Sequence, residues 1–117
     1  DAGYGGAPAG RGAFVVATSY GQPVACGGVV PLDATYGEAV AEIKRMWVDP
    51  GWRGPGLGSR LLRHLEQLAR DLGHRRVLLD TNATLVEAVA MYERAGYAHV
   101  ERYNDNPYAQ AWFAKDL

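Results

Sequence analysis

The chain of 117 residues contains one cysteine and three histidines. A single cysteine cannot form a disulfide within the chain, and Cys26 stands in an apolar, strand-like run, where a small core residue is expected rather than a nucleophile. The histidines, His64, His74 and His99, do not show the spacing of metal ligands, so no metal site is expected. The scarcity of these residues excludes a disulfide-stabilised domain and predicts a cytoplasmic protein.

Neither sign of charge is in excess, since 12 basic residues stand against 13 acidic ones and the formal net charge is −1. No long run of Lys or Arg occurs, so we expect no nucleic-acid and no membrane surface. No apolar stretch approaches the roughly 18 residues of a membrane helix, and no signal peptide is visible. The chain does have 48% hydrophobic residues, with three Trp and seven Tyr, which is enough for the core of one soluble domain.

The chain begins at Asp1, and residues 1–12 are rich in Gly, Ala and Pro. Such a stretch buries little apolar surface, so we expect a flexible lead-in to a single domain that spans 1–117. A first residue that is Asp rather than Met indicates a fragment of a longer protein.

Hydrophobic periodicity predicts a mixed α/β domain with the order β, β, β, α, β, α, β, β. Residues 14–18 and 23–30 are typical of an antiparallel hairpin, and Glu38 to Val48 alternates as a third strand. Leucines at three- and four-residue spacings predict a helix that starts near Leu57 and ends before Gly73.

The rest of the pattern completes a strand–helix–strand crossover. Residues 76–80 form a short apolar strand, and Thr84 with Glu87 has the spacing of a capping box at the start of a second helix, which Gly96 ends. The last two strands are expected over 97–103 and 108–113, on either side of a polar turn.

A glycine-rich segment, Arg53 to Ser59, lies between the third strand and the leucine-striped helix. Glycines there let backbone N–H groups point outward without interference from a Cβ, and the helix N-terminus adds unpaired donors and its positive dipole end. No acidic side chain intervenes, so phosphate or pyrophosphate is the expected anion. A tight turn into the helix explains the same glycines, and their spacing fits neither a Walker loop nor a dinucleotide fingerprint.

This loop reads Arg53-Gly54-Pro55-Gly56-Leu57-Gly58 and resembles the Q/R-x-x-G-x-G/A signature of the GNAT superfamily of acyl-CoA-dependent N-acetyltransferases. Residues 87–97 resemble the family's A-x-x-L/M-Y-x-x-x-G-F/Y helix, and residues 41–48 resemble its central strand. The resemblance covers 14–117 and implies a mixed, mostly antiparallel sheet with flanking helices around a central strand, phosphate loop and helix. The family's usual first strand and the one or two helices after it are not found in these residues.

The resemblance implies that an acetyl group moves from acetyl-CoA to a primary amine of a small molecule, an amino acid or a protein. The central strand would pair with the pantetheine arm, and the loop would hold the pyrophosphate. Leu85 stands where many members carry an Asn, so binding would lean on backbone donors, or on Asn82 or Thr84. The cofactor-binding residues that it implies are Met46, Trp47, Val48, Arg53, Gly54, Pro55, Gly56, Leu57, Gly58 and Ser59.

Two side chains are candidates for the proton transfers. Tyr92 is the aromatic that the family's second helix aims at the CoA sulfur, where its hydroxyl would protonate the departing thiolate; a core-packing ring is the alternative. Glu42 is the candidate base, since regular alternation puts it on the face of Met46, roughly 13 Å along the strand and within reach through water. A surface carboxylate paired with Lys44 or Arg45 is the alternative. An N–H of Met46 or Trp47 would donate to the thioester oxygen.

The acceptor is a primary amine, with a small molecule or amino acid preferred because no acidic patch suited to a Lys-rich tail is visible. An aromatic and polar turn would border the acceptor pocket, although turn chemistry also explains it. It contains Tyr103, Asp105, Asn106 and Tyr108. A homodimer is possible.

Two other classes of function remain open: a non-catalytic acyl-CoA-sensing module, and a partner-binding domain that adds a strand at its N-terminal sheet edge.

Overall fold

The computed structural model describes residues 3–5, 8–9, 12–32, 34–37, 39–54 and 56–117. Their strands form one eight-stranded sheet in the order β1-β3-β4-β5-β6-β8-β7, with β2 also paired to β3. The strands are β1 (Gly3–Gly5), β2 (Pro8–Ala9), β3 (Gly12–Ser19), β4 (Gln22–Pro31), β5 (Val40–Val48), β6 (Arg76–Thr81), β7 (Ala98–Val100) and β8 (Ala111–Asp116). The helices are α1 (Leu57–Asp71) and α2 (Val86–Arg94), with short 3-10 turns η1 (Ala34–Tyr36) and η2 (Pro50–Trp52).

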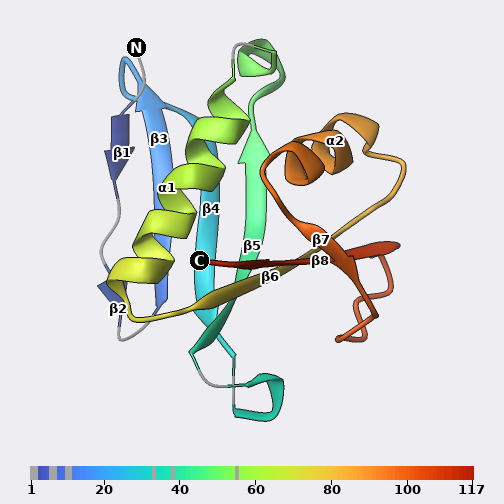
Figure 1. Cartoon of the computed structure of the whole chain (residues 1–117). Helices are drawn as coiled ribbons and strands as arrows, with labels where there is room; N and C mark the ends of the chain where they lie inside the picture. The colour runs from blue at the N-terminus through green and yellow to red at the C-terminus, as the bar shows by residue number, and fades with distance from the viewer. Residues whose placement is uncertain (1–2, 6–7, 10–11, 33, 38, 55) are drawn as a thin grey trace.

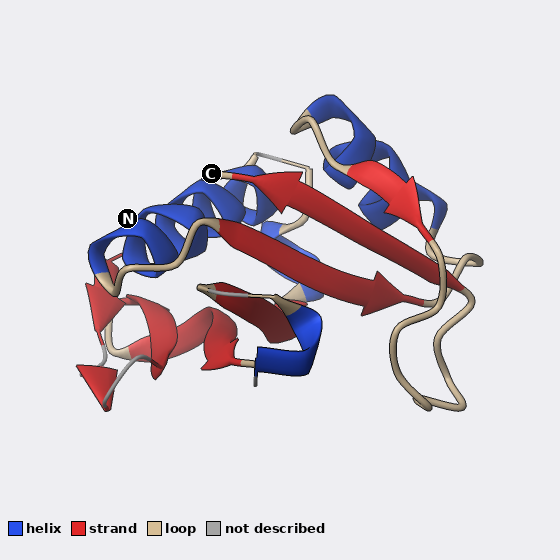
Figure 2. Ribbon diagram, turned by 60° about the horizontal axis from the view of Figure 1, so that its bottom comes forward, coloured by secondary structure: helices blue, strands red, loops and turns tan. Residues whose placement is uncertain are grey.

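The predicted order of elements from β3 onward is confirmed, and the class is mixed α/β with a mostly antiparallel sheet (Figure 1). The chain makes an antiparallel meander through β3, β4 and β5, and then crosses through α1 to β6, which is parallel to β5. Figure 2 shows α1 and α2 on the same side of the sheet. Both helices therefore pack against one face of the sheet and leave the other face without an α-helix among the described residues. No helix in the described ranges is both long enough and apolar enough to span a bilayer.

The glycine-rich stretch predicted as a flexible lead-in contains two short strands. β1 and β2 both pair antiparallel with β3. Strand pairing uses backbone groups, which Gly and Ala supply as well as any residue, and the outer edge of β3 offers unpaired partners for them. Composition alone therefore underestimated the structure in this region.

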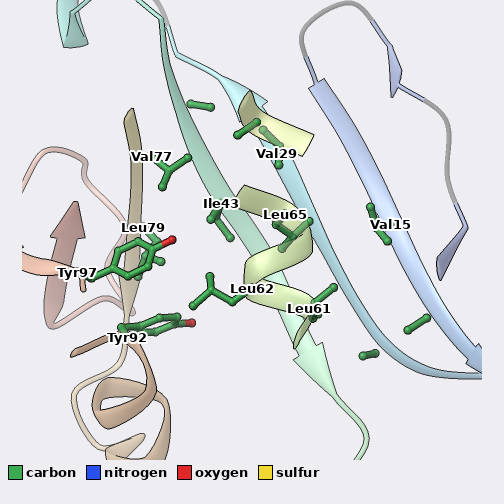
Figure 3. Packing of buried hydrophobic residues seen from close by; sticks show 14 of the residues in the cluster. Val15, Val29, Ile43, Leu61, Leu62, Leu65, Val77, Leu79, Tyr92 and Tyr97 are labelled. Carbon is green, nitrogen blue, oxygen red and sulfur yellow. The ribbon is translucent and has the colours of Figure 1, made fainter. Parts of the chain in front are cut away.

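Most of the core lies between α1 and the sheet. Leu61, Leu62 and Leu65 are at most 1% exposed and belong to one cluster with Val29 and Ile43 of β4 and β5, and Figure 3 shows Leu65 beside Ile43. Burying each such side chain contributes about 1.5–3 kcal/mol to folding. The leucine stripe of the sequence thus fixes which face of α1 meets the sheet, and with it the place of the α1 N-terminus.

A β-bulge in β5 changes which side chains share a face. Cys26 of β4 faces Trp47 and Gly28 faces Lys44, so one residue of β4 opposes two residues of β5. Arg45, one of these two, has a left-handed φ of 57°. Met46 therefore packs on the α1 side of the sheet, and the expectation that it shares a face with Glu42 is wrong.

The second helix ends before Gly96, as predicted, but its start differs from the prediction. Leu85 is the N-cap of α2, and its side chain makes no capping hydrogen bond. The predicted capping box does not form, because the Thr84 hydroxyl donates instead to Asn82 Oδ1 at 2.8 Å, and the Thr84 N–H donates to the same oxygen at 2.9 Å. A local Asx turn has replaced the cap.

The last two strands are displaced from their predicted bounds, since β7 ends at Val100 and β8 starts only at Ala111. Between them, Asn104 and Asn106 accept hydrogen bonds from the backbone N–H groups two residues ahead, at 3.3 and 3.0 Å. These turns lie on the polar turn that the sequence predicted and extend it to Tyr108, which was expected to begin the final strand.

Candidate active site

A cleft of about 970 Å³ opens between the end of β5, the loop before α1, and α2. Eight of the ten predicted cofactor-binding residues line it: Met46, Trp47, Val48, Arg53, Gly54, Gly56, Gly58 and Ser59. Leu57 does not, because it is 2% exposed and points into the core. Pro55 lies outside the described residues. The structure thus brings the two predicted segments, strand end and glycine loop, to one site.

The cleft exists because β5 and β6 separate. The two strands pair only from Val40 to Glu42 with Arg76 to Leu78, whereas β5 stays paired with β4 as far as Val48. Figure 1 shows the two strands diverging, with α2 beyond the gap. The two strands therefore splay apart beyond Glu42, and the edge of residues 43–48 on the β6 side faces the gap without a ladder partner among the described residues.

The glycine loop leaves the N-terminus of α1 open. Gly56 is the N-cap in a left-handed conformation, with φ 87°, and no atom lies within 4 Å of the place where a Cβ would stand. The first turn of α1 contains no acidic residue. Its N–H groups have no acceptor within the helix, and the dipole end adds positive potential. An anion is the ligand that suits this end of the cleft.

Two neighbours of the loop are held by local contacts. Arg53 donates from Nε to the carbonyl of Val48 at 3.0 Å, which ties its guanidinium to the end of β5. Asp49 accepts from the N–H of Gly51 at 2.9 Å and caps η2. The Asp49 side chain is thereby used in a turn and does not line the cleft, whereas Glu87 of α2 does.

Tyr92 lies in the wall of the cleft and is 7% exposed. Its ring packs against Tyr97 and Phe113, with centroid distances of 5.8 and 5.6 Å, and Figure 3 shows its hydroxyl directed toward Leu62. Burial, and then the negative charge of Asp80, raises the pKa of this hydroxyl above its usual value near 10. The ring has the core-packing role that the sequence offered as an alternative, and the hydroxyl keeps its proton at neutral pH.

Glu42 lies on the opposite face of the sheet and is 5% exposed. It accepts hydrogen bonds from Tyr103 Oη at 2.6 Å and Asn104 Nδ2 at 3.2 Å, and Lys44 Nζ lies 3.4 Å from its other oxygen. Burial, and then the hydrogen bond to Glu42, raises the pKa of Tyr103, so this hydroxyl remains a donor. Glu42 is therefore a buried carboxylate with three polar partners rather than a surface carboxylate. It lies at the last pair of the β5–β6 ladder, where the two strands separate.

A polar cluster that sequence reasoning missed surrounds this carboxylate. Asn104 Nδ2 contacts both Glu42 and Asp80, Asn106 Nδ2 donates to Asp80 at 3.2 Å, and Trp112 Nε1 donates to Asn104 at 3.0 Å. The one available signal was Asp80 itself, an acidic residue within an apolar strand, on the face that it shares with Leu78.

The turn expected to border an acceptor pocket divides into two parts. Tyr103 and Asn106 belong to the polar cluster, and Tyr36 of η1 packs edge-on against Tyr103 with centroids 6.1 Å apart. The side chains of Asp105 and Tyr108 are exposed, and Tyr108 contacts the cluster through its backbone N–H, which donates to Asn106 Oδ1. Figure 2 places this turn on the side of the sheet away from the helices.

No cysteine or histidine is among the described residues that line the cleft. Cys26 Sγ lies 3.6 Å from the carbonyl of Arg45, and His99 pairs with Glu93 at 2.9 Å on an exposed part of β7. Within the ranges that the structure describes, no three His, Cys, Asp or Glu side chains gather in a way that would hold a metal ion.

Comparison with known proteins agrees with this architecture. Residues 4–97 match the model of the Acetyltransferase (GNAT) family. Over 89 residues the chain is 35% identical to an Escherichia coli K12 protein named "Uncharacterized N-acetyltransferase YjgM", which covers 76% of this chain and 53% of that protein. The chain spans about half the length of the curated relatives it matches.

Solved structures show the same fold. A GNAT-family acetyltransferase from Staphylococcus aureus MU50 superimposes with a TM-score of 0.83 at 20% identity, covering 92% of this chain and 69% of that one. A GNAT-family acetyltransferase from Elizabethkingia anophelis, solved with acetyl-CoA bound, gives a TM-score of 0.74 at 16% identity, covering 92% and 77%. The glycine loop, the forked sheet and the match over residues 4–97 together assign the chain to the Acetyltransferase (GNAT) family.

Proposed function

We propose that the chain is an N-acyltransferase that moves an acetyl group from acetyl-CoA to a primary amine of a small molecule, an amino acid or a protein. The observation that carries the proposal is the cleft itself. It runs from the open N-terminus of α1, along the unpaired end of β5, to the hydroxyl-bearing ring of Tyr92. An elongated molecule with a pyrophosphate at one point and a reactive thioester at its end suits this shape.

The residues at the two ends of the cleft fit acetyl-CoA. Backbone N–H groups of residues 53–59 would hold the pyrophosphate, since Gly54 and Gly56 have no atom within 4 Å of a Cβ position and leave room for close approach. The main chain of residues 46–48 would pair with the pantetheine arm along the unpaired edge. Leu85 and Val86, 55% and 71% exposed at the rim, offer apolar contact in place of a polar side chain.

The gap between β5 and β6 would bring the two proton-transfer groups to opposite sides of the reacting centre. Glu42, on the far face, would take a proton from the acceptor ammonium through water, because only the neutral amine attacks the thioester. An N–H of Met46 or Trp47 would donate to the developing oxyanion. As the C–N bond forms and the C–S bond breaks, Tyr92 would give its proton to the departing thiolate, and the proton that the nitrogen loses on becoming an amide would return through water to the Tyr92 oxygen.

Calorimetric titration with acetyl-CoA, followed by measurement of free-thiol release over a panel of amines, tests the proposal. Binding together with amine-dependent thiol release supports the acyltransferase. Binding without turnover on any amine would favour the acyl-CoA-sensing module instead, and no binding heat would favour a partner-binding domain. Desulfo-CoA, which keeps the pyrophosphate but offers no thioester, serves as the control for binding without reaction.

A further inference from the structure

The spacing between β5 and β6 beyond their short ladder depends on side chains. The last ladder pair joins Glu42 to Leu78. From there β6 continues beside β8 and β5 continues beside β4, and the described residues contain no further pair between β5 and β6. One side chain from the loop after β7 spans the fork at this point, and it belongs to Asn104.

The Asn104 side chain uses its full hydrogen-bonding capacity. Its Nδ2 donates to Glu42 Oε2 on β5 at 3.2 Å and to Asp80 Oδ2 on β6 at 2.5 Å. Its Oδ1 accepts from Trp112 Nε1 at 3.0 Å and from the N–H of Asn106 at 3.3 Å. An amide has two donor hydrogens and two acceptor lone pairs. Because each has a partner, the amide has one satisfied orientation, and its nitrogen faces the two carboxylates.

The backbone of this residue is anchored as well. Arg102 Nε donates to the Asn104 carbonyl at 2.8 Å, and the Arg102 guanidinium lies 5.5 Å from the centre of the Trp112 ring. Trp112 is paired with Asp80 across β6 and β8. The loop is thus fastened to the strand beside the fork, so the Asn104 amide is a fixed bridge rather than a passing contact.

We propose that Asn104 is a positioning residue for the acyl transfer: it ties the carboxylates of Glu42 and Asp80 together across the fork and so holds Glu42 at the point where β5 and β6 separate. The inference rests on the proposed function, in which Glu42 receives the proton of the amine. Two carboxylates that contact one nitrogen repel each other when that donor is removed. Without the amide, Glu42 would move away from the fork, and small displacements of a catalytic group cost large factors in rate.

Other charged and titratable groups also face Glu42. They are Lys44 on its own strand, Asp80 on β6, and Tyr103, whose ring packs against Tyr36. Lys44 is half exposed, with 51% of its side chain accessible, so solvent screens its charge. Tyr103 donates to the same oxygen as Asn104, so an Asn104 variant keeps this donor and loses only the amide. The change in carboxylate titration caused by loss of Asn104 therefore reports on the bridge.

The test compares Asn104→Ala with Gln67→Ala, which removes another amide hydrogen bond, that of Gln67 to Asp71 at 2.9 Å on exposed α1. Carboxyl resonances of Glu42 and Asp80 are followed by NMR against pH, which needs no turnover. We expect the titration midpoint of the pair to rise in Asn104→Ala only, because the carboxylates lose a donor that stabilises their charged form. We also expect kcat to fall at least tenfold, the acidic limb of its pH profile to move upward with the NMR midpoint, and acetyl-CoA affinity to change less than twofold.

Three results would overturn the proposal: an unmoved carboxyl titration, a loss of kcat with an unmoved pH profile, or an equal loss in Gln67→Ala. A wild-type protein that binds no acetyl-CoA or releases no thiol overturns the proposed function, and this is seen before any variant is made, while the NMR titration still decides whether the bridge exists. If Asn104→Ala does not fold, the side-chain amide resonances of wild-type Asn104 decide instead. Their chemical shifts should change as each of the two carboxylates titrates. Chemical shifts that do not change with the titration of Glu42 or of Asp80 would refute the bridge.

Discussion

Gly58 offers the sharpest test of where the cofactor lies. It stands in the first turn of α1 and lines the cleft, and a Cβ added there would lie 3.2 Å from Met91 Sδ and 3.8 Å from Val48 Cγ2. Replacement by Ala adds only that Cβ, which a small shift of the flexible Met91 side chain accommodates. Replacement by Val adds two further methyl groups between α1, α2 and β5. We expect Gly58→Val to narrow the cleft next to the pyrophosphate position, and Gly58→Ala to leave it nearly open.

The size of the effect follows from opposing contributions. Gly in a helix is about 1 kcal/mol less favourable than Ala, and Val is better than Gly as well, so neither substitution should unfold α1. Gly56 is different, because its φ of 87° costs any L-residue about 1–2 kcal/mol without a steric clash. We therefore expect Gly58→Val to weaken acetyl-CoA binding at least tenfold, about 1.4 kcal/mol, at an unchanged melting temperature. Gly56→Ala should lower the melting temperature.

Calorimetry and thermal denaturation measured on the same preparations separate these two effects. Gly58→Ala is the matched control, and its dissociation constant should stay within about threefold of wild type. A folded Gly58→Val protein that binds acetyl-CoA as wild type does would refute the placement of the pyrophosphate beside this turn.

Three further predictions concern the buried tyrosines and Glu42. Tyr92→Phe keeps the ring and removes only the hydroxyl, so kcat should fall while acetyl-CoA affinity is retained. Because the pKa of Tyr92 is raised above its usual value near 10, the ratio of wild-type kcat to variant kcat should be the same at every pH below about 10. A ratio that varies between pH 6 and 9 would contradict this role. Glu42→Gln should lower kcat/KM by about 10² and flatten the acidic limb of its pH profile, and wild-type rates would mean that solvent accepts the proton. Tyr97→Phe removes the 2.8 Å hydrogen bond to buried Glu66, so the free energy of unfolding should drop by about 1–3 kcal/mol, measured by urea denaturation, with Tyr108→Phe on the exposed turn as the unaffected control.

The amino-acid sequence by itself determined the features that depend on neighbouring residues. The leucine spacing of α1, the stop at Gly73 and the hairpin before β5 all express contacts within a few positions along the chain, and each is found where it was predicted. The glycine loop is a local feature too, since a left-handed N-cap at Gly56 requires only that residue's own freedom. The segments that build this half of the cleft, and eight of the ten residues assigned to it, could therefore be predicted from the sequence.

Tertiary structure alone decided the other half. At the bulge, one residue of β4 opposes two of β5, one of which is Arg45. As a result Met46 lies on the opposite face of the sheet from Glu42, whereas regular alternation predicts the same face. The partners of Glu42, Tyr103 and Asn104, lie 61 and 62 positions further along the chain. No periodicity connects residues at such separations, because their contact depends on how β6, β8 and the loop between β7 and β8 pack around the fork. The sequence thus determined the segments that line the cleft, and the packing of distant segments determined what lies across the sheet from it.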